Sequence, residues 1–135
     1  MAGEAFDFVV MGIPRTPASR SRKTWQEKVK TAASDEWPEG QAPFEGELSA
    51  RIVYFFPEQT SVDVDNIIKP ILDALEGLVY ENDRVVFEVL CRKSSLSELT
   101  ILANAPLKLV QSLQDDTDQV FVRICEGPNH EELPL

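Results

Sequence analysis

Residues 61–75 read SVDVDNIIKPILDAL, a stretch in which charged groups stand directly before an apolar helix pattern. The apolar positions recur at helical spacing: Ile68, Ile71, Leu72 and Leu75. This spacing predicts a helix that buries one face. A separate polar face holds Lys69, Asp73 and Glu76, which follow one another at i, i+4 and i+7. The acidic residues Asp63 and Asp65 then stand at the N-terminus of the helix.

The spacing of these charged residues is compatible with a metal site. If the chain is extended at Asp63 and Asp65, both carboxylates leave the same side. One helical turn separates Asp65 from Lys69, so the three side chains can converge on one spot. Close carboxylates repel each other unless a cation lies between them, and Mg²⁺ favours carboxylate, water and phosphate oxygens. Asp83, in the turn after the helix, supplies a third carboxylate if the following strand runs beside the strand that ends at Phe56.

The same residues also have a purely structural explanation. Asp65 or Asn66 can cap the helix, Lys69 can pair with Asp65 or Asp73, and Asp83 is a common turn residue. Spacing alone slightly favours this explanation over the metal site.

Strands are expected on both sides of the helix, because short apolar runs alternate with polar residues and end at Pro or Gly. The expected elements are a strand in FDFVVMGIP (6–14), a helix over 24–36, strands in ELSARIVYFFP (47–57) and VVFEVLCRK (85–93), a further short strand in ELTILAN (98–104), a short helix in PLKLVQSL (106–113) and a last strand in QVFVRIC (119–125). This order predicts an α+β fold over residues 1–127, a single domain with a mixed β-sheet and helices mostly on one face. An acidic C-terminal tail over 128–135 is expected to fray.

Composition indicates one ordinary globular domain, since 43% of the 135 residues are hydrophobic and 27% are charged. No apolar run is long enough to span a membrane and the N-terminus lacks a signal-peptide pattern, so a cytoplasmic protein is expected. The net charge of −10 opposes indiscriminate binding to nucleic acid. However, residues 1–32 carry six basic against three acidic residues, and residues 111–135 carry one basic against six acidic. A polyanion is therefore expected to meet the N-terminal region.

Cysteine and histidine offer little chemistry. Cys91 and Cys125 lie in separate apolar runs without a close Cys or His partner, which predicts buried free thiols and argues against a zinc site or a disulfide. The only histidine, His130, lies in the tail, which argues against a Ser-His-Asp triad, a Cys-His pair or a histidine-rich metal site.

One block of the sequence resembles a known family. The pattern Asp63-x-Asp65-Asn66-x-x-Lys69, followed by Asp73-Ala74-Leu75, Gly77 and an acidic turn that ends in Asp83, resembles the RusA family of Holliday junction resolvases. The segment MGIPRTPASR (11–20), with the basic residues and Trp25 after it, also resembles the N-terminal part of that family. The likeness extends from about residue 6 to residue 125, and the block from Asp63 to Asp83 is its specific part. It favours the metal site over the helix cap.

The resemblance implies a RusA-like fold and a Mg²⁺-dependent endodeoxyribonuclease, with Mn²⁺ as a substitute ion, that acts as a homodimer and nicks paired strands of four-way DNA junctions in recombination and repair. Asp63, Asp65 and Asp83 match the family's catalytic carboxylates and metal ligands, and Lys69 matches its catalytic lysine. The family commonly has an acid where this chain has Asn82, a difference expected to tune metal affinity without abolishing it.

The N-terminal basic residues Arg15, Arg20, Arg22 and Lys23 are then expected to follow DNA phosphates, although a merely solvated basic loop is an equal alternative. Two other functions stay open on the same fold. One is a non-catalytic module that binds branched DNA or a protein, and the other is a nuclease for flaps and other branched DNA.

Overall fold

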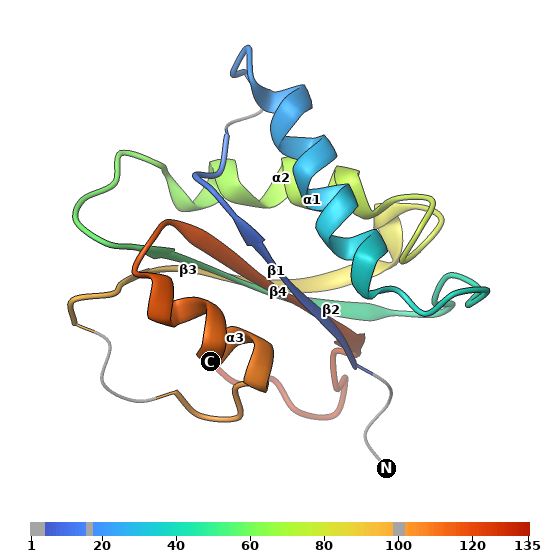
Figure 1. Ribbon diagram of the computed structural model, residues 1–135. Helices are drawn as coiled ribbons and strands as arrows, with labels where there is room; N and C mark the ends of the chain where they lie inside the picture. Colours follow the sequence, from blue (N-terminus) through green and yellow to red (C-terminus); the bar gives the residue numbers. More distant parts are fainter. Residues whose placement is uncertain (1–4, 16–17, 99–101) are drawn as a thin grey trace.

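Helix α2 (Val64–Leu75) connects two neighbouring parallel strands, β2 (Leu48–Phe56) and β3 (Val86–Ser95), in a computed structural model that describes residues 5–15, 18–98 and 102–135 (Figure 1). The other elements are β1 (Ala5–Met11), α1 (Arg22–Glu36), the 3₁₀ turn η1 (Asp83–Val85), α3 (Leu107–Ser112), the 3₁₀ turn η2 (Leu113–Asp115) and β4 (Gln119–Glu126). Together they form a single four-stranded sheet with helices packed against it.

The sheet is mixed, as the sequence predicts. Its strand order is β1-β4-β2-β3, with β4 antiparallel to both β1 and β2 and only β2 and β3 parallel. A parallel pair needs a crossover connection, and α2 provides it. The end of β3 lies beside the start of α2, because Lys93 Nζ donates to the carbonyl of Val62 at 3.0 Å. The start of β3, and η1 before it, therefore lie near the C-terminal end of α2.

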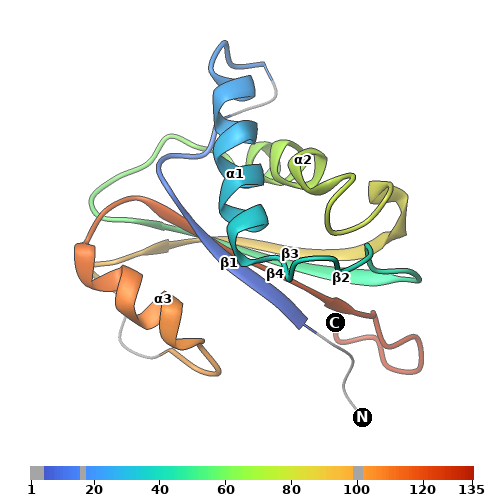
Figure 2. The same ribbon diagram turned by 45° about the vertical axis from the view of Figure 1, so that its right-hand side comes forward.

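Helices α1 and α2 cover one face of the sheet and the short helix α3 lies on the other (Figures 1 and 2). The larger core fills the α1 and α2 side of the sheet with residues from these helices and from the strands, including Phe8, Trp25, Ile52, Ile71 and Leu75. A smaller cluster under α3 consists of Phe55, Leu109 and Phe121. The prediction of an α+β domain with helices mostly on one face is confirmed.

Strand β2 shows how the apolar alternation selects a face. Its apolar alternation leads to the expectation that Leu48, Ala50, Ile52, Tyr54 and Phe56 share the buried face; the first four are buried in the larger core and Phe56 is half-buried. Successive strand residues point to opposite faces, so Arg51, Val53 and Phe55 are left for the face that α3 partly covers. Tyr54 also anchors the end of the strand, because its hydroxyl donates to Asp118 Oδ2 at 2.5 Å.

Strand β3 departs from the expected alternation at its start. Strict alternation along VVFEVLCRK (85–93) leads to the expectation that Phe87 shares a face with Val89 and Cys91, but the register slips there: Leu48 pairs with Val86 and Ser49 pairs with Glu88. Phe87 is the extra residue of this irregularity and its side chain is 56% exposed, so that expectation is wrong. A bulge of this kind cannot be read from alternation, which assumes one residue opposite one.

Both cysteines are free, as predicted, but they are only half-buried. Burial raises the pKa of the Cys91 thiol to about 11, so this thiol is unreactive near neutral pH. The strand expected within 98–104 falls on residues 99–101, which lie outside the described residues, and residues 102–104 form no strand. Within the part of the chain that is described, no helix is both long and apolar enough to cross a membrane.

Replacement of Leu75 by Ala tests the packing of α2 on the sheet. Leu75 is 0% exposed, so its loss should lower the free energy of unfolding by about 2–5 kcal/mol in urea denaturation. Leu107→Ala is the matched control, because Leu107 is 70% exposed and its replacement should change stability by less than about 0.5 kcal/mol. Equal effects of the two changes would contradict the described packing.

Candidate functional site

The ammonium group of Lys69 joins helix α2 to the turn before β3. Lys69 Nζ lies 2.9 Å from Asp73 Oδ1, one turn later on the helix, and 2.8 Å from Asp83 Oδ2 in η1. The hydrogen bond to Asp83, and then that to Asp73, raise the pKa of Lys69 above its ordinary value. Lys69 is therefore a permanent cation near neutral pH, suited to stabilise negative charge and unsuited to accept a proton.

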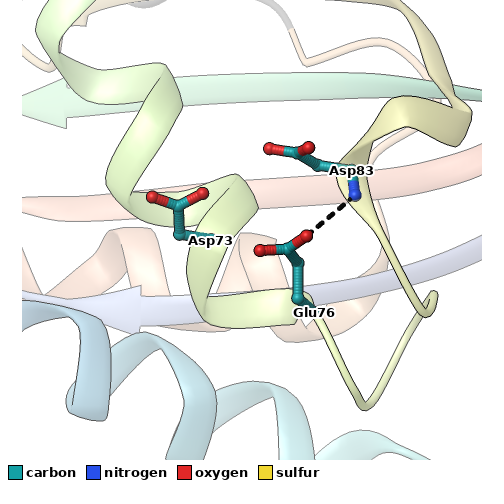
Figure 3. Close-up of side chains that lie close together, drawn as sticks. All are labelled: Asp73, Glu76 and Asp83. Atoms are coloured by element: carbon teal, nitrogen blue, oxygen red, sulfur yellow. Dashed lines mark hydrogen bonds between the residues drawn. The ribbon is translucent and has the colours of Figure 1, made fainter.

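Three carboxylates gather around this cation. One side-chain oxygen from each of Asp73, Glu76 and Asp83 lies within 4.8 Å of the other two, and all three residues are half-buried. Figure 3 shows the three side chains. Glu76 Oε2 also accepts the backbone N–H of Asp83 at 3.0 Å, the bond dashed in Figure 3. Among the described residues this is the only group of three such side chains. Three carboxylates and one ammonium leave a net negative charge, and oxygen donors of this type are those that hard divalent cations prefer.

The connection from α2 to η1 is fixed by its own hydrogen bonds. The buried Tyr80 hydroxyl donates to the carbonyl of Leu72 at 2.7 Å, and Gly77 N donates to the carbonyl of Tyr80 at 2.8 Å. Gly77 has a φ of 85°, a left-handed conformation that favours glycine. Burial, with added repulsion from Asp83 and the other nearby carboxylates, raises the pKa of Tyr80 above its ordinary value, so its hydroxyl remains a donor. These hydrogen bonds fix the connection between α2 and η1 in a conformation that places Asp83 next to Lys69.

Asn82 has a definite structural task beside Asp83. It is the N-cap residue of η1, and its Oδ1 accepts from Arg84 N at 2.9 Å and from Arg84 Nε at 3.2 Å. An amide oxygen performs this capping without adding another negative charge next to Asp83. This contact is a physical role for Asn82 at the position where the sequence resemblance would favour an acid.

The start of α2 differs from the sequence expectation. The helix begins at Val64 with Asp63 as its N-cap residue, so Asp63 and Asp65 do not lie along an extended strand. The expectation that Asp65 or Asn66 caps the helix is also wrong, and Asp63 itself makes no side-chain cap hydrogen bond. Both carboxylates are exposed. Within residues 5–15, 18–98 and 102–135, neither has a hydrogen bond or an ion pair from its side chain.

Lys69 therefore stands between two acidic groups on one helix. Asp65, Lys69 and Asp73 follow one another every four residues, a rise of about 6 Å per step. Asp83 was expected beside the helix start, but it lies next to the second half of α2, together with Asp73 and Glu76. The sequence identified Lys69, Asp73 and Glu76 as one face, and this was the signal that could have predicted their proximity. The described contacts link Lys69 to Asp83 and leave Asp63 and Asp65 outside the three-carboxylate group.

The N-terminal basic residues form a separate exposed surface. Arg15 lies before α1, Arg20 just before its start, and Arg22 and Lys23 in its first turn, and all four are exposed. Both ribbon views place the start of α1 farther from the sheet than α2 (Figures 1 and 2). In the described chain none of these four residues takes part in an ion pair, so their charges are available to an external anion.

Comparison with known families supplies an independent observation. The sequence model of the family described as Endodeoxyribonuclease RusA matches residues 9–102, well over half of the 135-residue chain. The match includes the whole of α2 and η1, together with the basic segment before α1. No curated protein matches the chain.

Replacement of Glu76 by Ala tests how Asp83 is held. Loss of the charged acceptor should expose the Asp83 amide, because a hydrogen bond to a charged group contributes about 1.5–3 kcal/mol. We expect amide hydrogen exchange at Asp83 to accelerate about tenfold or more. Glu76→Gln keeps an acceptor oxygen and should retain most of the protection. Unchanged exchange in Glu76→Ala would show that this bond does not fix the turn.

Proposed function

The chain belongs to the RusA endodeoxyribonuclease family, and from this membership we propose that it resolves four-way (Holliday) DNA junctions by Mg²⁺-dependent hydrolysis of phosphodiester bonds in recombination and repair. The observation that carries the proposal is the fixed ammonium of Lys69, held 2.8 Å from Asp83 and one helical turn from Asp65. A cation surrounded by carboxylates on an exposed face suits a negatively charged phosphate and a divalent ion together.

We propose Asp63, Asp65 and Asp83 as the ligands of Mg²⁺, with Mn²⁺ as a substitute. The donor chemistry fits, because all three are carboxylates, and Asp63 and Asp65 have no competing protein partner in the described chain. Asp73 and Glu76 offer a second set that shares Asp83 with the first. When bound, the ion would polarise the scissile phosphate and lower the pKa of a coordinated water.

The protein's own groups have distinct tasks in this proposal. Lys69, a compact cation whose pKa is raised by its two carboxylate partners, stabilises negative charge that develops on the phosphate or the leaving oxygen. Glu76 holds the backbone of Asp83, and Asn82 caps the turn that presents it. None of these residues needs to lose a proton for its role.

Substrate geometry suggests how the protein is used. A four-way junction has symmetry-related strands to cut, so a two-fold homodimer supplies one site to each. The N-terminal residues Arg15, Arg20, Arg22 and Lys23 would follow phosphates of the junction arms. We place this activity in the cytoplasm.

Cleavage of a labelled four-way junction tests the reaction. With Mg²⁺ we expect symmetric nicks that EDTA abolishes, and Asp65→Asn and Asp83→Asn should each lower the rate by about 100-fold or more. Asp35→Asn is the matched control, because Asp35 is an exposed residue of α1 that lies beside β1, at the edge of the sheet opposite β3. Tight junction binding without product at any metal concentration would favour a non-catalytic binding module. Equal cutting of flaps and junctions would favour a broader branched-DNA nuclease.

The same assay separates the two possible ligand sets. If Asp63, Asp65 and Asp83 hold the ion, Asp65→Asn should raise the Mg²⁺ concentration required for cleavage far more than Asp73→Asn does. The reverse order would assign the ion to Asp73, Glu76 and Asp83.

Sedimentation tests the assembly. We expect a dimer at micromolar concentration without DNA, because paired nicks need two sites held in one complex. A monomer at that concentration would contradict the homodimer.

A further inference from the structure

The sheet face opposite α1 and α2 carries a groove of about 470 Å³ that the proposed reaction does not use. Strands β2, β3 and β4 form its floor, and residues 102–106 with Leu109 form one wall. Its charged residues are three arginines, one from each strand: Arg51, Arg92 and Arg123. The groove thus gathers positive charge in a chain whose net charge is −10.

Strand register places these arginines close together. Arg51 of β2 lies directly opposite Arg123 of β4, and Arg92 of β3 lies opposite Val53, two residues along β2 from Arg51. Neighbouring strands are about 4.8 Å apart, so the three guanidinium groups share one small region of the face. Like charges directly opposite each other destabilise a sheet unless an anion compensates them.

Among the described residues, only one of the three arginines has an acidic side chain as a partner. Arg123 pairs with Asp7 Oδ2 at 3.0 Å and lies over the ring of Phe121, 5.2 Å from its centre. Arg51 and Arg92 are exposed, and neither takes part in an ion pair within residues 5–15, 18–98 and 102–135. Two guanidinium groups in a groove are therefore available to an external anion.

We propose that this groove binds the sugar-phosphate backbone of a DNA strand, as a second DNA contact surface on the far side of the sheet from Lys69. The inference rests on the proposed action on DNA but not on the metal or on cleavage. Guanidinium groups match phosphate oxygens in planar, bidentate geometry. The aromatic rings of the floor, Phe55 and Phe121, are only 3% and 4% exposed, so they offer bases no stacking platform. The exposed apolar residues of the lining, Leu90 and Leu102, are aliphatic and do not stack on bases. A backbone contact without base readout is what remains.

The test is the salt dependence of junction binding, measured in EDTA so that no strand is cut. Each phosphate contact contributes about 0.9 to the slope of log K against log salt concentration, so Arg51→Ala/Arg92→Ala should reduce the slope by about 1.8 for each protomer that contacts the junction. Arg51→Lys/Arg92→Lys keeps both charges and should keep the slope near the wild-type value. Arg20→Ala/Arg22→Ala measures the N-terminal surface in the same way. Thermal melting of each variant confirms that it is folded.

The outcomes separate this inference from the proposed function. If Arg51→Ala/Arg92→Ala leaves the slope unchanged while the wild type still cuts junctions, the proposal that the groove binds DNA is wrong and the proposed nuclease activity stands. If the slope falls in this variant but the wild type does not cut junctions, DNA binding in the groove is supported and the proposed nuclease activity is contradicted. A labelled poly-glutamate peptide whose binding depends on Arg51 and Arg92, with an unchanged DNA slope, would reassign the groove to an acidic protein. A wild type that binds no junction would overturn both.

Discussion

The parallel pairing of β2 with β3 is the constraint on which the arrangement of the charged residues depends. Two parallel neighbours cannot be joined by a tight turn, so the chain must cross the sheet between them, and α2 is that crossing. The crossing returns the chain to the start of β3, which places η1 beside the second half of α2. Asp83 therefore meets Lys69 although 14 residues separate them in sequence.

The ion pairs of Lys69 with Asp73 and Asp83 contribute little to the free energy of folding. The Lys69 side chain is 59% exposed, and ion pairs this open to water usually contribute between about 0 and 1 kcal/mol. Stability comes instead from the apolar face of α2, whose Ile67, Ile71 and Leu75 are fully buried. The two faces of one helix are thus energetically separate. Charges on the outer face can be set by the chemistry of phosphate and metal binding, while the inner face holds the helix in place.

Local patterns predicted the elements better than they predicted contacts between them. The alternation in β2 and the helical spacing in α2 identified most of the buried positions, because burial imposes a period on each element separately; in α2, Ile71, Leu72 and Leu75 are buried as predicted, but Ile67 is fully buried where Ile68 was expected. The position of Asp83 depends on where β3 begins along α2, and the displaced Phe87 depends on a register slip between two strands. The first turn of α2 was also misplaced, since Asp63, Asp65 and Asn66 are all acceptable residues at a helix start. The spacing of the motif thus placed Lys69, Asp73 and Glu76 on one face of α2 without fixing where Asp83 lies relative to Asp63 and Asp65.

The distribution of charge, rather than its sum, decides how such an acidic protein could hold DNA. Positive residues concentrate before α1 and, on the other side of the sheet, in the groove with Arg51 and Arg92. The net charge of −10 opposes any polyanion that meets only one of these surfaces, because every phosphate contact is offset by repulsion from the rest of the molecule. A ligand that reaches both surfaces gains the second set of contacts at high effective concentration. Branched DNA presents several arms at different angles, whereas a straight duplex follows one line. On the proposal that both surfaces bind backbone, the acidic remainder of the protein raises selectivity for branched over linear DNA.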